Sequence, residues 1–129
     1  IKVFPSKCTG CRACVLACSL IKTGEERPQY SRIQVYRDEF IARTEKPIVC
    51  MNCTKPKCVH VCGTGALKTV EGIVFFDEKL CNLCSGSPKC VDVCPFKAIY
   101  FVDNKILKCD LCSGEPVCVK FCATKAIVT

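Results

Sequence analysis

Sixteen of the 129 residues are cysteine, and they fall into four groups of four. In every group two residues separate the first pair and three separate the last pair, while the middle gap varies. The groups are Cys8, Cys11, Cys14, Cys18; Cys50, Cys53, Cys58, Cys62; Cys81, Cys84, Cys90, Cys94; and Cys109, Cys112, Cys118, Cys122. Thiolates bind metals and thiols form disulfides, so this repeat predicts one of these chemistries.

Other residues recur in phase with the cysteines, which indicates an internal repeat. In three groups a proline precedes the third cysteine by two positions, and an alanine follows the fourth by four. These residues are Pro56, Pro88 and Pro116, and Ala66, Ala98 and Ala126. The first group lacks both features and is the divergent copy.

Disulfides and zinc explain the spacing less well than iron–sulfur ligation does. Structural disulfides belong to oxidising compartments, and cysteines three apart close almost no loop. A four-cysteine zinc site usually combines two C-x2-C pairs separated by about 12–20 residues. Here the second pair follows closely and has the spacing C-x3-C. A zinc-stabilised interaction module remains the alternative from another functional class.

The spacing C-x2-C-x2-C-x3-C is typical of 4Fe-4S ligation, in which the fourth cysteine binds the neighbouring cluster of a pair. The loop wraps three corners of the cluster, and its backbone N–H groups can face the sulfurs. Four such runs predict four 4Fe-4S clusters, with all sixteen cysteines as ligands.

The formal charge of +7 belongs to the chain with neutral thiols. With sixteen thiolates and four oxidised clusters the charge falls to about −1, so no nucleic-acid partner is expected. The length suits one domain or two very small ones. No apolar run is long enough to cross a membrane, and the first cysteine is reached before a secretory signal would fit. We therefore expect a cytoplasmic protein without direct membrane insertion.

Short elements must position the ligands. Residues 67–80 predict a hairpin around Glu71-Gly72, and residues 99–107 predict a second hairpin that turns at Asp103-Asn104. A single helical turn is expected to carry the third and fourth cysteine of each group. Residues 19–49 are interpreted as a surface insertion, with a strand pair formed by Ile33 and Val35 against residues 40–44.

The chain also resembles known electron carriers. The run 62–67, the hairpin at Gly72 and the run 81–84 resemble the centre of a bacterial two-cluster ferredoxin. The runs 7–14, 47–53 and 108–114 resemble the four-cluster polyferredoxin subunits of molybdenum and tungsten oxidoreductases, hydrogenases and carbon monoxide dehydrogenase systems. Such subunits of anaerobic metabolism relay electrons and have no substrate site of their own.

The resemblance implies an α+β fold of two interleaved ferredoxin-like units, with short antiparallel hairpins and one-turn helices around the clusters. We expect an outer unit of residues 1–20 plus 100–129, an insertion of residues 21–46 and an inner unit of residues 47–99. Because the inner hairpin lies between the second and third groups, the pairing is expected to be nested, as in that family. The expected sets are Cys50, Cys53, Cys58, Cys94; Cys81, Cys84, Cys90, Cys62; Cys8, Cys11, Cys14, Cys122; and Cys109, Cys112, Cys118, Cys18. The two ends of the chain should then meet, with Val3 and Phe4 near Ile127 and Val128.

No catalytic pattern accompanies the cysteines. His60, the single histidine, is interpreted as solvated or beside a cluster because its group is already complete. The sequence predicts a non-catalytic electron-transfer subunit that assembles with a catalytic oxidoreductase subunit, such as a tungsten or molybdenum aldehyde or formate oxidoreductase, and a second carrier. A freely diffusing polyferredoxin is the alternative.

Overall fold

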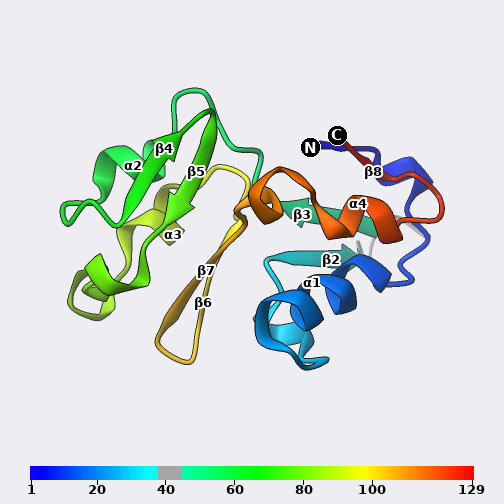
Figure 1. Ribbon diagram of the computed structural model, residues 1–129, viewed down its shortest axis with the longest axis horizontal. Helices are drawn as coiled ribbons and strands as arrows, with labels where there is room; N and C mark the ends of the chain where they lie inside the picture. Colours follow the sequence, from blue (N-terminus) through cyan, green and yellow to red (C-terminus); the bar gives the residue numbers. More distant parts are fainter. Residues whose placement is uncertain (38–44) are drawn as a thin grey trace.

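The computed structural model describes residues 1–37 and 45–129 as two lobes of short elements (Figure 1). The strands are β1 (Lys2–Val3), β2 (Ile33–Arg37), β3 (Glu45–Val49), β4 (Leu67–Val70), β5 (Ile73–Phe76), β6 (Ile99–Val102), β7 (Lys105–Lys108) and β8 (Ile127–Val128). The α-helices are α1 (Ala13–Thr23), α2 (Lys57–Val61), α3 (Lys89–Val93) and α4 (Val117–Phe121). One lobe contains α2, α3, β4 and β5, and the other contains α1, α4, β2 and β3 (Figure 1).

Both hairpins predicted from the turn residues are confirmed. β4 pairs with β5 around Glu71 and Gly72, and β6 pairs with β7 around Asp103 and Asn104. All four turn residues have positive φ, between 50° and 79°. Two-residue hairpin turns favour this geometry because its twist matches that of the strands, so the Gly, Asn and Asp signals fixed both turns.

The two ends of the chain lie together, as predicted. β1 pairs antiparallel with β8, so that Lys2 faces Val128 and Val3 faces Ile127. The backbone N–H of Phe4 donates to the carbonyl of Ala126 at 2.7 Å and extends the pairing. Figure 1 shows the N- and C-terminal ends side by side on one lobe.

The segment 19–49 was expected to be a surface insertion, and this interpretation is wrong for much of it. Ile33, Val35 and Val49 lie in the core of the lobe, and Ser19 and Ser31 are fully buried. The described strand that pairs with β2 is β3, while the expected partner, residues 40–44, lies outside the described residues. Alternating apolar residues bury one face of this hairpin and leave the other exposed.

A one-turn helix was expected in every group, and this is wrong for the first group. α1 has 11 residues, runs past both Cys14 and Cys18, and ends at Gly24 in the left-handed conformation. No glycine or proline interrupts residues 13–23, and a left-handed glycine commonly terminates a helix. The first group therefore supplies the longest helix among the described residues.

Apolar packing is divided between two cores that include cysteine side chains. Val15, Ile33 and Ile127 contribute to one core, and Leu67 and Val74 to the other. The alanines that follow the repeated cysteines, Ala66, Ala98 and Ala126, are at most 1% exposed. All three recurring alanines are therefore buried, which agrees with a small apolar residue at this position of the repeat.

Candidate metal centres

Each one-turn helix holds its two cysteines in the same way. The third cysteine of the group lies inside the helix, and the fourth is the first residue after it. Pro56, Pro88 and Pro116 are the residues that precede these helices, in extended conformation. Proline suits the start of a helix because the first N–H groups have no partner in the helix. The repeated prolines therefore fix where each pair of ligands begins.

The loops of the third and fourth groups have an unusual backbone. Four consecutive residues in each loop have positive φ, namely 83–86 and 111–114, and the first three of each run are not glycine. Non-glycine residues in this region cost about 1–3 kcal/mol each and occur mainly at functional sites. Side-chain caps hold both loops, since the Asn82 Oδ1 accepts from the Cys84 N–H and the Asp110 Oδ1 from the Cys112 N–H, both at 2.9 Å.

Backbone N–H groups point at cysteine sulfurs at repeated positions. The residue two after the first cysteine donates to its Sγ at 3.4 Å in the last three groups. The residue four after the fourth cysteine donates to Cys94 Sγ at 3.4 Å and to Cys122 Sγ at 3.2 Å. Hydrogen bonds to the charged form of an acid stabilise it. These contacts favour thiolates.

Hydrogen bonds to sulfur lower the pKa of Cys62 and Cys122. Burial alone would raise the pKa of Cys62, but the Thr64 hydroxyl and the N–H groups of residues 64, 66 and 67 outweigh it and lower the pKa. For Cys122 burial also acts upward, and the backbone of Ile127 and the Thr124 hydroxyl lead the groups that lower the pKa. A threonine two positions after the fourth cysteine is thus a recurring contact that the sequence interpretation missed, although it repeats in phase.

The pKa of more deeply buried cysteines is raised instead of lowered. Burial raises the pKa of Cys14, Cys90 and Cys109 to about 11, and that of Cys118 to about 12. A thiol with such a pKa stays protonated at neutral pH unless a nearby positive charge favours the thiolate. These positions therefore suit ligands of a positively charged group rather than free thiolates.

Three cavities each contain one of the nested cysteine sets. Their cysteine walls are Cys18, Cys109, Cys112 and Cys118 in the first, Cys50, Cys53, Cys58 and Cys94 in the second, and Cys62, Cys81, Cys84 and Cys90 in the third. Each set combines three cysteines of one group with the fourth cysteine of another.

The remaining set surrounds Cys14. Burial is the main cause of its raised pKa, and the charges of Cys8, Cys11 and Cys122 add to it. Cys122 of the last group is therefore close enough for its charge to act on Cys14, as are Cys8 and Cys11 of the first group. The structure thus brings twelve of the predicted ligands together around three cavities, in the expected groupings, and their role as ligands stays a prediction. His60 is exposed and stands outside them.

An unpaired polar atom tests whether these cavities suit a cluster. Asn52 lies between Cys50 and Cys53, and its Oδ1 accepts from the Val74 N–H at 2.8 Å. Its Nδ2 is buried without a hydrogen-bond partner among the described residues. Buried donors are rarely left unpaired, and inorganic sulfide is an acceptor. Four thiols, donors aimed at sulfur and this free N–H fit a 4Fe-4S cluster. Within residues 1–37 and 45–129, no three His, Cys, Asp or Glu residues are placed to hold a lone metal ion.

Comparison with known families agrees with this chemistry. Residues 42–129 match the family described as 4Fe-4S dicluster domain, and residues 1–18 match the 4Fe-4S binding domain. The chain belongs to the 4Fe-4S dicluster family, and 4Fe-4S clusters are the cofactor of that family. No helix in the described part of the chain has the length and apolar character needed to span a membrane.

Two curated relatives and one solved structure illustrate the similarity. The chain is 38% identical to the aliphatic sulfonate oxidoreductase, polyferredoxin-like subunit, of Pyrococcus furiosus, over 73% of this chain and 70% of that one. It is 37% identical to the NADH-dependent phenylglyoxylate dehydrogenase subunit beta of Aromatoleum evansii, over 74% of this chain but only 28% of that protein. A chain in the BamBC active site complex of benzoyl coenzyme A reductase, in complex with zinc, aligns with a TM-score of 0.55 and 27% identity, over 98% of this chain and 74% of that one.

Proposed function

We propose that this chain is an electron-transfer subunit with four 4Fe-4S clusters held by the four nested cysteine sets. The main support is the correspondence between three cavities and three complete sets of four cysteines. When bound, each cluster supplies a one-electron change between its 2+ and 1+ states. The two relatives described above carry names of oxidoreductase subunits, so the chain is proposed to act within such a complex and to have no substrate site itself.

The contacts between sets support a linear order of the clusters. The set of Cys8 and the set of Cys109 share α1 and α4, since each group supplies the fourth ligand of the other. The set of Cys50 and the set of Cys81 share α2 and α3 in the same way. Cys50 of one pair lies close to Cys109 of the other. Burial is the main cause of the raised pKa of Cys109, and the charge of Cys50 raises it further. Electrons would therefore cross between the lobes at this point.

A groove beside the cluster set of Cys50 is proposed as the contact with the catalytic subunit. The groove has a volume of about 640 Å³ and is lined by residues of β2, β3 and the segment after Cys94. Met51, Pro95 and Phe96 line both this groove and the cavity of the Cys50 set. A partner in the groove would lie one layer of side chains away from this cluster, and short separation favours electron transfer.

The groove also indicates the chemistry of its occupant. Tyr36 is 54% exposed and Phe96 is 46% exposed, and the charged residues among the described lining are Lys46 and Lys97. An apolar segment flanked by acidic residues complements such a surface. We therefore propose that the oxidoreductase subunit presents this type of segment. Part of this proposed contact, Tyr36 and residues 46–49, lies on β2 and β3 within segment 19–49.

Cluster content is the direct test of the proposed function. Anaerobically purified chain should contain about 16 Fe and about 16 acid-labile sulfides, and its broad visible absorption should bleach with dithionite. Stoichiometric zinc with little iron would overturn the proposal in favour of a zinc module. Sedimentation in native extract should place the chain in a large complex, and migration at the size of the free chain would favour a diffusing polyferredoxin.

The groove has a matched test on the same complex. Tyr36→Glu adds a negative charge to the groove and should release the chain from the complex while iron content stays unchanged. Ile21→Glu is the control, because Ile21 is 61% exposed on α1 and lies outside the groove. Equal retention of the two variants in the complex would exclude the groove as the contact.

A further inference from the structure

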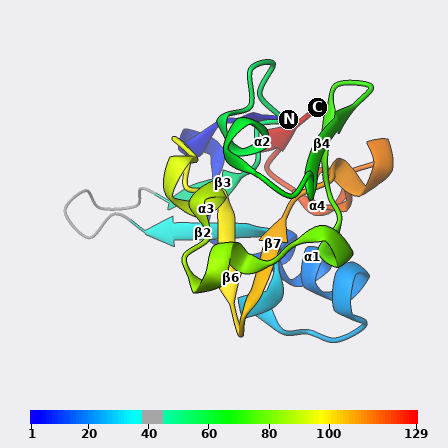
Figure 2. The ribbon, with the colours of Figure 1, turned by 90° about the vertical axis from the view of Figure 1, so that its left-hand side faces the viewer.

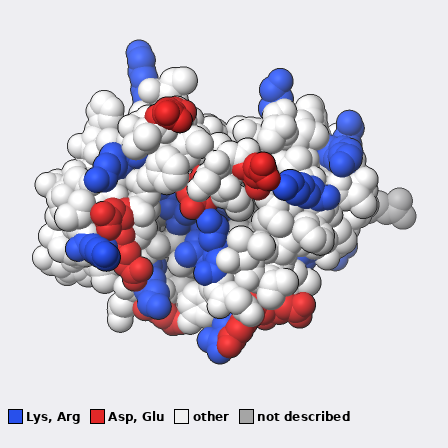
Figure 3. Space-filling model, in the orientation of Figure 1, with Lys and Arg blue, Asp and Glu red and all other residues white. Residues whose placement is uncertain are grey.

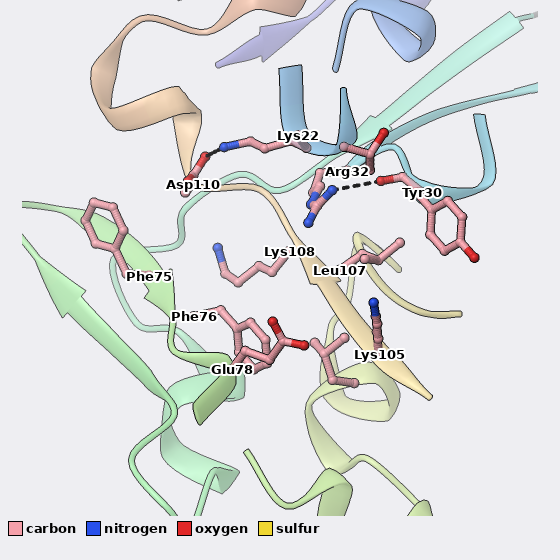
Figure 4. Close-up of a pocket in the computed structure, with 12 residues that line it drawn as sticks. Lys22, Tyr30, Arg32, Phe75, Phe76, Glu78, Lys105, Leu107, Lys108 and Asp110 are labelled. Carbon is pink, nitrogen blue, oxygen red and sulfur yellow. Dashed lines mark hydrogen bonds and ion pairs between the residues drawn. The ribbon is translucent and has the colours of Figure 1, made fainter. Parts of the chain in front are cut away.

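Lys108 is the one charged side chain that is buried among the described residues, at 6% exposure. It is the last residue of β7 and directly precedes Cys109. Figure 4 shows it between β7 and the strand that carries Phe75, in a cavity of about 470 Å³. Lys and Arg side chains gather in the hollow at the middle of the face seen in Figure 3. In Figure 1 β7 lies between the two lobes, and Figure 2 shows the same strand from the side of the lobe that contains α2 and α3.

The Lys108 Nζ donates three hydrogen bonds. Its acceptors are Cys50 Sγ at 3.1 Å, the Val74 carbonyl at 2.9 Å and the Cys109 carbonyl at 2.7 Å. An ammonium group has three N–H donors, and the three acceptors around Nζ match that number. The side chain therefore brings a full positive charge into contact with a cluster ligand.

No carboxylate among the described residues forms an ion pair with Lys108. Asp110, the nearest acidic residue in sequence, pairs with Lys22 at 2.7 Å instead. Burying an unpaired ammonium costs several kcal/mol, and the two carbonyls offset only part of that cost. The Cys50 thiolate and the cluster that it would hold are therefore the negative partners that make this burial favourable.

The contacts of Lys108 reach both middle cluster sets. Cys50 belongs to the set with Cys53, Cys58 and Cys94, and Cys109 belongs to the set across the lobe junction. Lys108 contacts Cys50 through the ligand sulfur but Cys109 only through its carbonyl. The set of Cys50 is therefore expected to receive the larger electrostatic effect.

We propose that Lys108 is a positioning residue that raises the reduction potential of the cluster held by Cys50, and to a smaller extent that of the cluster held by Cys109. Reduction adds one negative charge to a cluster, and a fixed neighbouring cation stabilises that charge. Hydrogen bonds to ligand sulfur and nearby charge are established determinants of cluster potential. Lys108 thus favours retention of electrons at the junction of the lobes. This inference rests on the proposed cluster sets.

Potentiometric titration followed by electron paramagnetic resonance tests the proposal. Lys108→Gln keeps a hydrogen-bond donor but removes the charge, and it should shift the reduction equilibrium of one cluster at least tenfold toward the oxidised form, about 59 mV for one electron. A second cluster should shift less, and the outer two should not shift. Lys108→Arg should restore the potentials. Lys105→Gln is the matched control, because it removes an exposed charge from the same strand and should leave all four potentials unchanged.

Full iron content with unaltered potentials in Lys108→Gln would overturn the proposal, and so would an equal shift of all four clusters. If this variant loses iron, a measurement on the wild-type protein tests the proposal instead. Labelling with [ζ-15N]lysine should give a 15N hyperfine coupling to one reduced cluster in pulsed paramagnetic resonance, and absence of any coupling would also overturn the proposal. Failure of the proposed function is recognised separately, because wild-type protein would then lack iron and sulfide.

Discussion

Val3 pairs with Ile127 in the antiparallel sheet that joins the two ends of the chain. Cys8 follows β1 shortly, and Cys122 precedes β8 by a few residues, so the sheet brings the first and last cysteine groups together. Ile127 is 1% exposed and packs against Val3 in the core of this lobe. The proposed outer cluster pair would therefore depend on residues that lie more than 100 positions apart in the sequence.

Replacing Cys122 with Ala should damage the cluster of the first group. In the proposed nested pairing Cys122 belongs to the set of Cys8, Cys11 and Cys14, so its loss removes one ligand from that set and leaves the set of Cys109, Cys112 and Cys118 complete. Iron should fall from about 16 to about 12 per chain, or a three-iron cluster should form. Paramagnetic resonance of Cys8→Ala gives the reference, and both variants should lose the same signal. Loss of the signal that Cys112→Ala removes would exclude the nested pairing.

Truncating Ile127 to Ala should loosen the outer unit. The side chain is fully buried where the terminal sheet meets the core, and an Ile→Ala substitution at such a site costs about 2–5 kcal/mol. Thermal bleaching of the visible absorption should occur at lower temperature. Val128→Ala is the control. Val128 is only partly buried, so this variant should lose much less stability. Equal midpoints for the two variants would show that the sheet does not support the clusters.

The sequence predicted the parts of the fold that local signals and the cysteine spacing determine. Glu71-Gly72 and Asp103-Asn104 located both hairpins, since turn residues with positive φ leave few alternatives. The position of the first hairpin between the second and third groups also predicts the nested ligation, which stays a prediction. The meeting of the chain ends was a consequence of that grouping, not of any property of Val3 or Ile127 themselves.

The sequence did not predict features that depend on contacts between distant residues. The polar stretch after Cys18 was interpreted as surface, but it leads into a hairpin that belongs to the core. Ser19 and Ser31 are polar residues that are nevertheless buried. The Ser19 hydroxyl donates to the Glu25 carbonyl at 2.7 Å and accepts from the Arg27 N–H at 2.6 Å, which ties this turn to α1. No local signal marks Lys108 as buried, because two of its three acceptors, Cys50 Sγ and the Val74 carbonyl, lie far from it in the sequence.

The chain without clusters should not fold. Its apolar cores are small and contain cysteine side chains, and the buried Lys108 would lose its negative partner. In such proteins the free energy of metal binding is also the free energy of folding. Removal of iron by a chelator under denaturing conditions, followed by return to buffer, should give circular dichroism typical of an unfolded chain. Reconstitution with iron and sulfide should restore the native spectrum, and a native spectrum before reconstitution would contradict the prediction.

Asp110 combines a loop cap with an ion pair, and two substitutions separate these roles. Its Oδ1 accepts from the Cys112 N–H and from the Lys22 Nζ, which connects α1 to the last cysteine loop. Asn82 caps the corresponding loop of the third group with the same distance, so Asp110→Asn should keep the cap and lose only the ion pair. A partly exposed pair contributes about 0–1 kcal/mol. Asp110→Ala should cost about 1–2 kcal/mol more, because it also removes the cap.

The pH dependence of the Asp110 contribution follows from its lowered pKa. Burial acts upward, but the Lys22 ammonium and the Cys112 N–H outweigh it and lower the pKa below 3.8, the ordinary value. A carboxyl group with a lowered native pKa stabilises the fold above its unfolded pKa, and this stabilisation is lost as the pH falls through the native pKa. The difference between wild type and Asp110→Asn, measured as the rate of chelator-induced bleaching, should therefore be constant from about pH 5 to about pH 8. Asp110→Ala should bleach faster than Asp110→Asn throughout this range, and equal rates would show that the cap at Cys112 does not protect the cluster.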